Sequence, residues 1–280
     1  PLWSPDGSRI AFASSAEDNG SEIYVYWLAQ NRLARLTQLE SSPSGMSWSP
    51  DGKHLAFSMK VPARQPSLVS PPTKPEGAEW ADPPRVTTRL KHESDGSGYI
   101  KPGFRHLFIV SAEGGTARQI TSGERQYGSS PVWTQDGASL VFSANLNEDW
   151  EYDFRNSEIY KVDIASGEVT ALTDRNGPDG SPAVSPDGEQ ILYTGFDDKV
   201  QTYQVSKMYV MNTDGSGKKE IPLNLDRSVS SPSWAADGNG FYFMYDDQGN
   251  TKIAYANLRG KHSVVTGNVG GTSIGRPYGG

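Results

Sequence analysis

Ten residues at 147–156 combine four carboxylates, three aromatic rings and one arginine. Asp149, Glu151 and Asp153 alternate with the aromatic residues, and Arg155 follows them. Carboxylates interleaved with aromatic rings can hold a cationic group, such as the amino terminus of a peptide, by charge and by ring faces. We therefore take these four residues as candidate substrate-binding residues. The alternative is a solvated loop whose aromatic side chains cap the sheet beneath it.

The other chemical motifs in the sequence do not predict a catalytic or metal-binding site. A Gly-x-Ser-x-Gly string occurs at 271–275, but a nucleophile elbow needs a strand before it and a helix after it. Here Arg276 and Pro277 follow at once, so we expect no catalytic residue and no Ser-His-Asp triad in these 280 residues. The oxygen-rich stretches 174–180 and 246–250 do not fit a calcium loop and are interpreted as turns.

The histidines also give no metal site. His54 and His106 adjoin predicted strands, whereas His92 and His262 fall in predicted loops, and no two have ligand spacing on one element. We interpret all four as solvent-exposed or strand-edge residues. The sequence thus predicts neither a metal site nor a cofactor.

Composition narrows the class of protein. The net charge of −7 argues against a nucleic-acid partner, and no apolar run approaches the length of a membrane span, so no membrane partner is expected. The chain has no cysteine, which excludes disulfides and thiol nucleophiles but leaves the compartment open between bacterial periplasm and cytoplasm. Glycine and proline, 30 and 19 residues, are too frequent for a helical protein.

One phrase, ending in Asp-Gly, recurs five times. Its copies lie at 2–7, 47–52, 132–137, 183–188 and 233–238. Trp3, Trp48, Trp133 and Trp234 occupy one position of the phrase, and Val184 replaces tryptophan in the fourth copy. The spacings between these positions are 45, 85, 51 and 50 residues, and three of the four match the period of a propeller blade.

Each phrase is followed by alternating apolar residues, then by a second apolar strand, and in several copies by a short closing strand such as 35–37, 119–121 or 171–173. The Pro-Asp-Gly turn has a clear basis, because Pro presets φ, Asp accepts a local backbone bond and Gly takes the left-handed conformation. These units predict an all-β fold, a β-propeller of four-stranded blades. A β-sandwich with regularly spaced hairpins is the alternative.

The long second interval predicts a proline-rich insertion at 60–103 within the second blade. Its first half cannot form a regular ladder, whereas 85–90 could form a strand, with a turn at 94–98 after it. A loop of this length is either a functional lid or contact surface, or disordered. Without it, the length fits about five blades. Because Pro1 leads directly into an inner strand and 267 onward resembles the start of a sixth unit, we expect one incomplete propeller domain over 1–280, from a ring of seven or eight blades.

Several pieces of the chain resemble a known family. They lie at 95–99 leading into 105–108, at 156–160, at 172–175, at 245–252 and at 270–278. Together they resemble the propeller domain of the prolyl oligopeptidase family of serine peptidases, in its acylaminoacyl peptidase and dipeptidyl peptidase-like branch. The Ser-Pro-Asp-Gly phrase alone is less specific, because periplasmic Tol-system propellers share it.

The resemblance implies a non-catalytic propeller that gates access to a covalently linked α/β-hydrolase domain and helps to anchor short peptide substrates. In the dipeptidyl peptidase branch, acidic residues of the propeller bind the substrate's amino terminus. The 149–153 string is similar to that motif but lacks its adjacent pair of glutamates. A stand-alone Tol-type propeller, acting as a protein-interaction module, is the alternative. A second copy of the chain is a further candidate partner.

Overall fold

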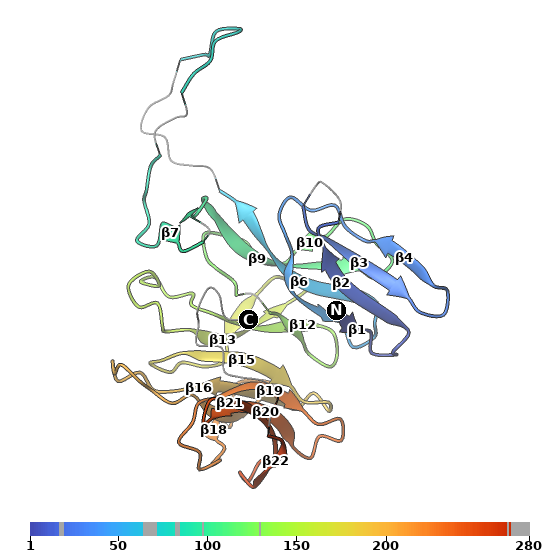
Figure 1. Cartoon of the computed structure of the whole chain (residues 1–280), viewed down its shortest axis with the longest axis vertical. Helices are drawn as coiled ribbons and strands as arrows, with labels where there is room; N and C mark the ends of the chain where they lie inside the picture. Colours follow the sequence, from blue (N-terminus) through green and yellow to red (C-terminus); the bar gives the residue numbers. More distant parts are fainter. Residues whose placement is uncertain are drawn as a thin grey trace.

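The computed structural model describes residues 1–16, 20–63, 72–81, 85–96, 98–128, 130–267 and 269. In this part of the chain all regular structure is β, in five four-stranded antiparallel sheets and one two-stranded hairpin. Figure 1 shows the sheets following one another from the blue first blade to the red fifth blade. The predicted all-β propeller with four-stranded blades is confirmed.

The blades use their strands in chain order. The first contains β1 (Leu2–Trp3), β2 (Arg9–Ser14), β3 (Glu22–Trp27) and β4 (Arg32–Arg35). The second contains β5 (Ser44–Trp48), β6 (His54–Pro62), β9 (Gly103–Ser111) and β10 (Arg118–Gln119). The third contains β11 (Val132–Trp133), β12 (Ser139–Ala144), β13 (Glu158–Asp163) and β14 (Val169–Ala171).

The fourth blade contains β15 (Asp179–Val184), β16 (Gln190–Gly195), β17 (Lys207–Asn212) and β18 (Lys219–Glu220). The fifth contains β19 (Val229–Trp234), β20 (Phe241–Asp247), β21 (Asn250–Ala256) and β22 (His262–Thr266). The first strands of successive blades contact one another, from β1 through β5, β11 and β15 to β19. Pro1 therefore does lead into an inner strand.

The repeated phrase forms the turn between the first two strands of every blade. The glycine of each Asp-Gly pair has a positive φ, from 67° at Gly52 to 78° at Gly188. In each turn the Asp carboxylate accepts a backbone hydrogen bond from the residue two positions on, as Asp6 does from Ser8 at 3.1 Å. A Ser or Thr two residues before the Asp donates a second bond in the first four turns, and these bonds lower the pKa of each of those carboxyls.

The tryptophan of the phrase joins neighbouring blades. Trp48 Nε1 donates to the Leu2 carbonyl at 3.2 Å, Trp133 Nε1 to the Ser47 carbonyl at 3.2 Å, and Trp234 Nε1 to the Ala183 carbonyl at 2.9 Å. Each bond runs to the inner strand of the preceding blade. At the junction of blades three and four, Val184 has no such donor. That junction must therefore be held in another way.

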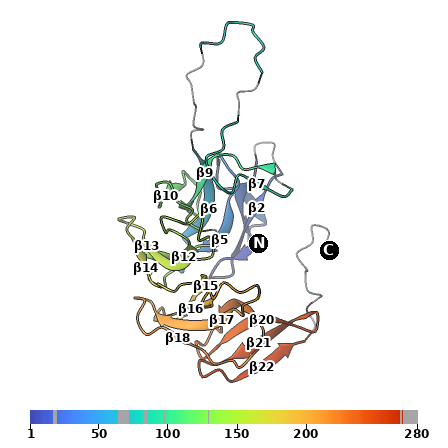
Figure 2. The same ribbon diagram turned by 90° about the vertical axis from the view of Figure 1, so that its left-hand side faces the viewer.

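The core lies between the blades rather than within any one of them. Each of four buried apolar clusters combines residues of two successive blades, such as Leu107 and Ile109 with Leu140 and Phe142. A sheet that is covered on both faces needs apolar residues on both faces of its middle strands, as the sequence has them. Figure 2, turned by 90°, shows the fourth and fifth sheets as neighbours at one end of the molecule.

Three threonines close the blades beside the third strands. Thr37, Thr121 and Thr173 each accept, through Oγ1, a hydrogen bond from a backbone amide of the third strand, at 2.9, 3.0 and 2.8 Å respectively. They come from the predicted closing segments at 35–37, 119–121 and 171–173. In the structure the fourth strands of these blades end before the threonines. At the threonine, the amide of the third strand bonds to the side-chain hydroxyl instead of to a backbone carbonyl.

Two interpretations of the histidines are wrong. His106 is buried, with 3% of its surface exposed, because it lies on the central strand β9 against Thr121 and Tyr127. Burial lowers the pKa of His106. His262 begins strand β22 instead of lying in a loop. Within the described residues no group of three or more His, Cys, Asp or Glu residues is arranged to hold a metal ion.

The insertion leaves the second blade between β6 and β9. These strands pair from His54 opposite Ser111 to Pro62 opposite Gly103, so the chain leaves the sheet after Pro62 and re-enters it at Gly103. Figures 1 and 2 show residues 72–81 standing clear of the blades. Nearer the sheet, β7 (Glu93–Ser94) and β8 (Gly98–Tyr99) form a small hairpin around Gly96, whose φ is 75°.

The strand predicted at 85–90 is wrong. These residues form no strand, because the second sheet is already complete: β6 and β9 occupy its centre and β5 and β10 its edges. The Gly-x-Ser-x-Gly string at 271–275 lies outside the described residues. So do the family-like tail at 270–278 and, except for Gly267 and Val269, the predicted sixth unit. The structure contains no helix long and apolar enough to cross a membrane, as judged on the described ranges.

Candidate functional site

Residues 147–156, which we call the acidic loop, lie in the connection from β12 to β13 in the third blade. Its backbone turns at Asp149, whose carbonyl accepts bonds from the amides of Tyr152 and Asp153 at 2.7 and 3.0 Å. Two asparagines brace the loop: Asn145 Nδ2 donates to the Asp153 carbonyl at 2.6 Å and Asn147 Nδ2 to the Asn156 carbonyl at 3.1 Å. This bracing fixes where the side chains at 150 and 151 point.

A cavity of about 500 Å³ lies between this loop and the insertion. Trp150 and Glu151 line it from the acidic loop, and Phe104 lines it from the start of β9. The insertion contributes most of the wall, and Glu124 and Arg125 contribute the rest. Its volume is within the range of about 300–1,000 Å³ that is usual for small-ligand sites. We call it the insertion cavity.

The four candidate residues are separated by this arrangement. Glu151 lines the insertion cavity, whereas Asp149, Asp153 and Arg155 are not among its lining residues. Asp149 is exposed, and Arg155 lies over the ring of Phe154, with 5.5 Å from the guanidinium carbon to the ring centroid. Substrate binding by these four residues stays a prediction, and the geometry favours Glu151 among them.

The Glu151 carboxylate has an incomplete set of contacts. Its Oε1 atom is buried and has no hydrogen-bond partner within the described residues. A buried carboxylate oxygen without a donor costs free energy, on the order of 1–3 kcal/mol. A ligand that brings an N–H or ammonium group to this atom would recover that free energy. The ring of Trp150, the neighbouring residue, lines the same cavity.

Two arginines of the insertion are held in the cavity by aromatic rings. The guanidinium carbon of Arg85 is 3.8 Å from the ring centroid of Tyr99. That of Arg89 is 4.3 Å from the Phe104 ring and 5.6 Å from the Trp150 ring. Ring faces attract and orient a cation but leave its charge in place. The sequence analysis missed both arginines. Their clustering with Lys91 and Lys101 was visible, but their position beside the acidic loop depends on how the insertion folds.

Lys60 lies beneath this group, at the end of β6. Its Nζ donates to the Lys101 carbonyl, and Gly103, opposite Pro62 in the β6–β9 pair, leaves no room for a Cβ beside Lys60. Burial lowers the pKa of Lys60, and the nearby charges of Arg89, Arg105 and Lys101 lower it further. The region under the insertion cavity is therefore crowded with positive charge.

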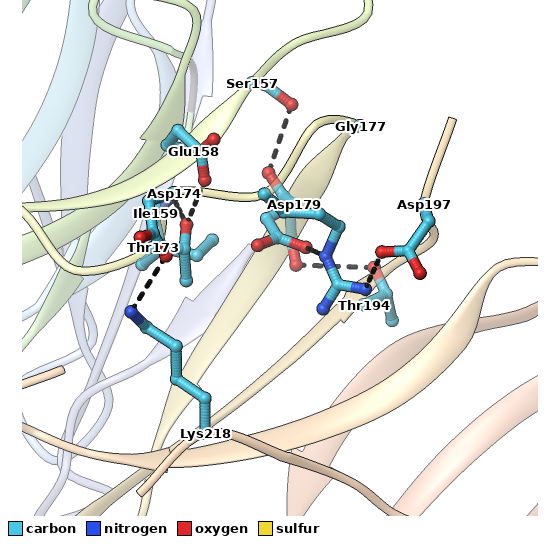
Figure 3. Close-up of polar contacts among 12 residues, drawn as sticks. Ser157, Glu158, Ile159, Thr173, Asp174, Gly177, Asp179, Thr194, Asp197 and Lys218 are labelled. Carbon is cyan, nitrogen blue, oxygen red and sulfur yellow. Dashed lines mark hydrogen bonds and ion pairs between the residues drawn. The ribbon is translucent and has the colours of Figure 1, made fainter. Parts of the chain in front are cut away.

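A second cluster of charges lies at the junction of blades three and four. Arg175, on the link between β14 and β15, forms ion pairs with Asp179 at 2.9 Å and Asp197 at 3.1 Å, as Figure 3 shows. Its guanidinium carbon is 3.9 Å from the Tyr209 ring centroid. Asp179 is 1% exposed, and Gly195 beside it is required because a Cβ there would collide with the carboxylate. We call this group the junction cluster.

The backbone of Asp179 connects the two blades. Its amide donates to the Ser157 carbonyl at 2.7 Å, and its carbonyl accepts bonds from Ser143 Oγ at 2.7 Å and Ser157 Oγ at 3.1 Å. These bonds are made at the one junction where Val184 replaces the tryptophan. The junction cluster thus supplies the polar contacts that the tryptophan supplies elsewhere. The turn predicted at 174–180 contributes Arg175 and Asp179 to this cluster, which no sequence signal indicated.

Burial shifts the pKa of several groups at the junction. It raises the pKa of Glu158 to about 7, although Thr173 Oγ1 donates to the carboxylate at 2.5 Å. It also raises the pKa of Asp179 to about 6, against the opposing charge of Arg175, and that of Tyr193 to about 12. A small cavity of about 210 Å³ adjoins these residues. Since the arginine is already paired with carboxylates, the cluster resembles a structural contact more than a ligand site.

Comparison with known proteins confirms the resemblance found in the sequence. Residues 73–202 match the family model of the dipeptidyl peptidase IV N-terminal region. An uncharacterized peptidase, YuxL of Bacillus subtilis, is 27% identical to this chain over 274 residues. The alignment covers 93% of this chain and 41% of YuxL. Dipeptidyl-peptidase 5 of Porphyromonas gingivalis is 25% identical over 286 residues, covering 95% of this chain and 40% of its own. This chain thus spans about two fifths of either relative.

Tol-system propellers are similar as well. The Tol-Pal system protein TolB of Francisella tularensis is 26% identical over 179 residues, 62% of this chain. Among solved structures, Pyrococcus horikoshii acylaminoacyl peptidase aligns with a TM-score of 0.68 at 21% identity, over 95% of this chain and 38% of that one. TolB from Acinetobacter baumannii aligns with a TM-score of 0.63 at 16% identity, over 96% of this chain and 54% of that one. These structures agree on the propeller fold.

Proposed function

We propose, from the resemblance of this chain to peptidase propeller domains, that it is the non-catalytic propeller part of a serine peptidase of the prolyl oligopeptidase family. In this proposal it gates access to an α/β-hydrolase domain and anchors short peptides for it. The similarity to two peptidases, each matched over about two fifths of its length, supports a catalytic domain elsewhere in the gene product.

The anchoring role is proposed for Glu151. The single observation that carries it is the buried Oε1 atom without a hydrogen-bond partner in the described part of the chain, in a cavity of peptide-compatible size. The free amino terminus of a peptide would donate to this atom, and the face of Trp150 would stabilise the same ammonium group. A peptide held by its amino terminus presents the peptide bond to be cleaved to the hydrolase domain at a fixed distance from that terminus.

Kinetics of the full-length gene product test this role. Glu151→Gln keeps the shape of the side chain but removes its charge, so we expect kcat/KM for peptides with a free amino terminus to fall about 10- to 100-fold, mainly through KM. Peptides with an acetylated amino terminus should be unaffected. The matched control is Glu148→Gln, an exposed carboxylate of the same loop that does not line the cavity.

Equal kinetics of Glu151→Gln and wild type on free-amino peptides would remove the anchoring role. The peptidase assignment has its own test, which is to read the coding sequence on both sides of these residues. It requires a hydrolase domain of roughly 250 residues with a strand-Ser-helix nucleophile elbow.

The similarity to TolB favours a second candidate, a protein-interaction module of the Tol type. The interaction-module hypothesis predicts no peptide hydrolysis by the full-length gene product and a stable complex with another protein of the cell envelope. It gives no role to the insertion cavity. Hydrolysis of peptides by the full-length product, lost on replacement of the elbow serine, would exclude it.

A further inference from the structure

The insertion cavity carries an excess of positive charge in a chain that is acidic overall. Its lining includes two carboxylates, Glu124 and Glu151, and five basic residues: Arg85, Arg89, Lys91, Lys101 and Arg125. The chain as a whole has a net charge of −7. The charge of the cavity is therefore local, and it comes mostly from the insertion.

Within the part of the chain that the structure describes, these basic residues keep their positive charge without a paired carboxylate. Arg85 and Arg89 are instead oriented by the rings of Tyr99, Phe104 and Trp150. An arginine fixed over an aromatic ring keeps its fork of N–H donors for a carboxylate in the bidentate geometry that it favours.

The insertion cavity brings an acidic and a basic side chain close together, Glu151 and Arg89. Arg89 lies over the ring of Trp150, the residue next to Glu151. Counting described residues alone, a guanidinium without an ion pair and the unpartnered Glu151 Oε1 atom therefore line the same cavity. Lys60 lies below them, and its pKa is lowered first by burial and then by the nearby charges of Arg89, Arg105 and Lys101. A ligand that suits this cavity brings one cationic group and at least one carboxylate.

We infer that the insertion cavity selects peptides that have an acidic side chain close to their free amino terminus. This inference rests on the proposed anchoring of the amino terminus by Glu151 and adds the preferred substrate class. The ammonium group binds Glu151, and the carboxylate of the first or second side chain binds Arg89 and its basic neighbours. Peptides with an uncharged side chain at that place leave the arginines without a counter-charge.

Calorimetric titration of this chain with four tripeptide amides tests the inference. Ala-Glu-Ala-amide and Ala-Gln-Ala-amide differ only in the charge of the second side chain, and each is used with a free and with an acetylated amino terminus. We expect the free Glu peptide to bind about 10-fold more tightly than the free Gln peptide. We also expect the ratio to shrink as salt screens the exposed charges.

Variants locate the effect. Arg89→Gln should reduce the preference to about 2-fold or less, while the exposed Arg259→Gln, in the turn of the fifth blade, should leave it intact. Circular dichroism and the thermal unfolding midpoint verify the fold of each variant. If Arg89→Gln does not fold, the exposed Lys101→Gln replaces it, with a smaller reduction expected.

The outcomes separate the two proposals. Equal binding of the free Glu and Gln peptides, with both weakened by acetylation, overturns the charge selection and leaves the anchoring role standing. Equal binding of free and acetylated peptides overturns the anchoring role, and with it the geometry assumed here. A preference for the Glu peptide that survives both Arg89→Gln and Lys101→Gln, or no measurable binding of the free Glu peptide at about 1 mM, overturns the inference as well.

Discussion

The insertion cavity and the junction cluster contain the same contact in two different settings. Arg85 lies 3.8 Å from the Tyr99 ring and Arg175 lies 3.9 Å from the Tyr209 ring. Arg175 also forms ion pairs with Asp179 and Asp197, whereas Arg85 has no carboxylate partner in the described structure. The comparison indicates that an arginine whose charge is satisfied inside the protein holds blades together. An arginine without a carboxylate partner is available to bind a ligand.

The largest expected effect is on stability, where replacement of Arg175 should cost far more free energy of unfolding than replacement of Arg89. Arg175→Met leaves Asp179 as a buried carboxylate without its cation, and we expect a loss of about 3–5 kcal/mol in the free energy of unfolding. Arg89→Met removes a similar stack over an aromatic ring but breaks no ion pair, so its loss should stay below about 1 kcal/mol. Urea unfolding of both variants measures this.

A second variant controls for the lost volume of the arginine. Arg175→Met combined with Asp179→Asn removes the unpaired charge and should recover part of the stability lost by Arg175→Met alone. Equal losses for Arg175→Met and Arg89→Met would break the comparison, because they would mean that the ion pairs of Arg175 do not stabilise the junction.

The pH dependence of stability should be set in part by the junction. The pKa of Glu158 is about 7 in the folded chain against an ordinary value of 4.5, so the folded state keeps a proton that the unfolded state releases between these values. The stabilisation is complete below about pH 4.5 and is lost as the pH rises through about 7. Asp179, with a pKa of about 6, acts in the same direction.

Urea unfolding across this pH range checks the effect. We expect the free energy of unfolding to fall by on the order of 1–3 kcal/mol between about pH 4.5 and pH 7.5, and the slope to become smaller in Glu158→Gln. Parallel curves for wild type and Glu158→Gln would show that Glu158 is not the group responsible.

The smallest effects come from the two tyrosines. Tyr99→Leu removes the ring under Arg85 at an exposed position, and we expect unchanged stability but a preference for the acidic peptide reduced about 2- to 5-fold. Tyr209→Leu, which removes the buried ring under Arg175, should reverse the pattern by lowering stability without changing the preference. Calorimetry and thermal unfolding of both variants distinguish the roles. The same effect from both substitutions would contradict the division between the two regions.

The sequence predicted those features that each blade repeats. The Asp-Gly turns have the same physical role in every blade, the tryptophan bond recurs at three of the four blade junctions, and a threonine closes each of the first three blades. One repeated pattern was therefore sufficient to place them. The acidic residues at 147–156 do lie in a loop, between β12 and β13. Its role in binding was a prediction from composition and stays one.

Features that occur once could not be predicted in this way. Arg175 and Asp179 are only four residues apart, and their turn-like sequence gave no sign that both side chains pack under the next blade against Tyr193 and Tyr209. Arg89 is about sixty residues from Trp150, and their contact depends on the path of the insertion. The segment 85–90 was considered a possible strand from its own residues, which cannot show whether a sheet edge is free.

The most direct test of the account is a binding cycle on Glu151. Calorimetry gives the ratio of dissociation constants for an acetylated and a free Ala-Glu-Ala-amide, first with the wild-type chain and then with Glu151→Gln. If Glu151 binds the amino terminus, the ratio is at least about 10 in the wild type and falls to about 1 in the variant. A ratio that is the same in both chains would contradict the central claim, because the amino terminus would then be recognised elsewhere or not at all.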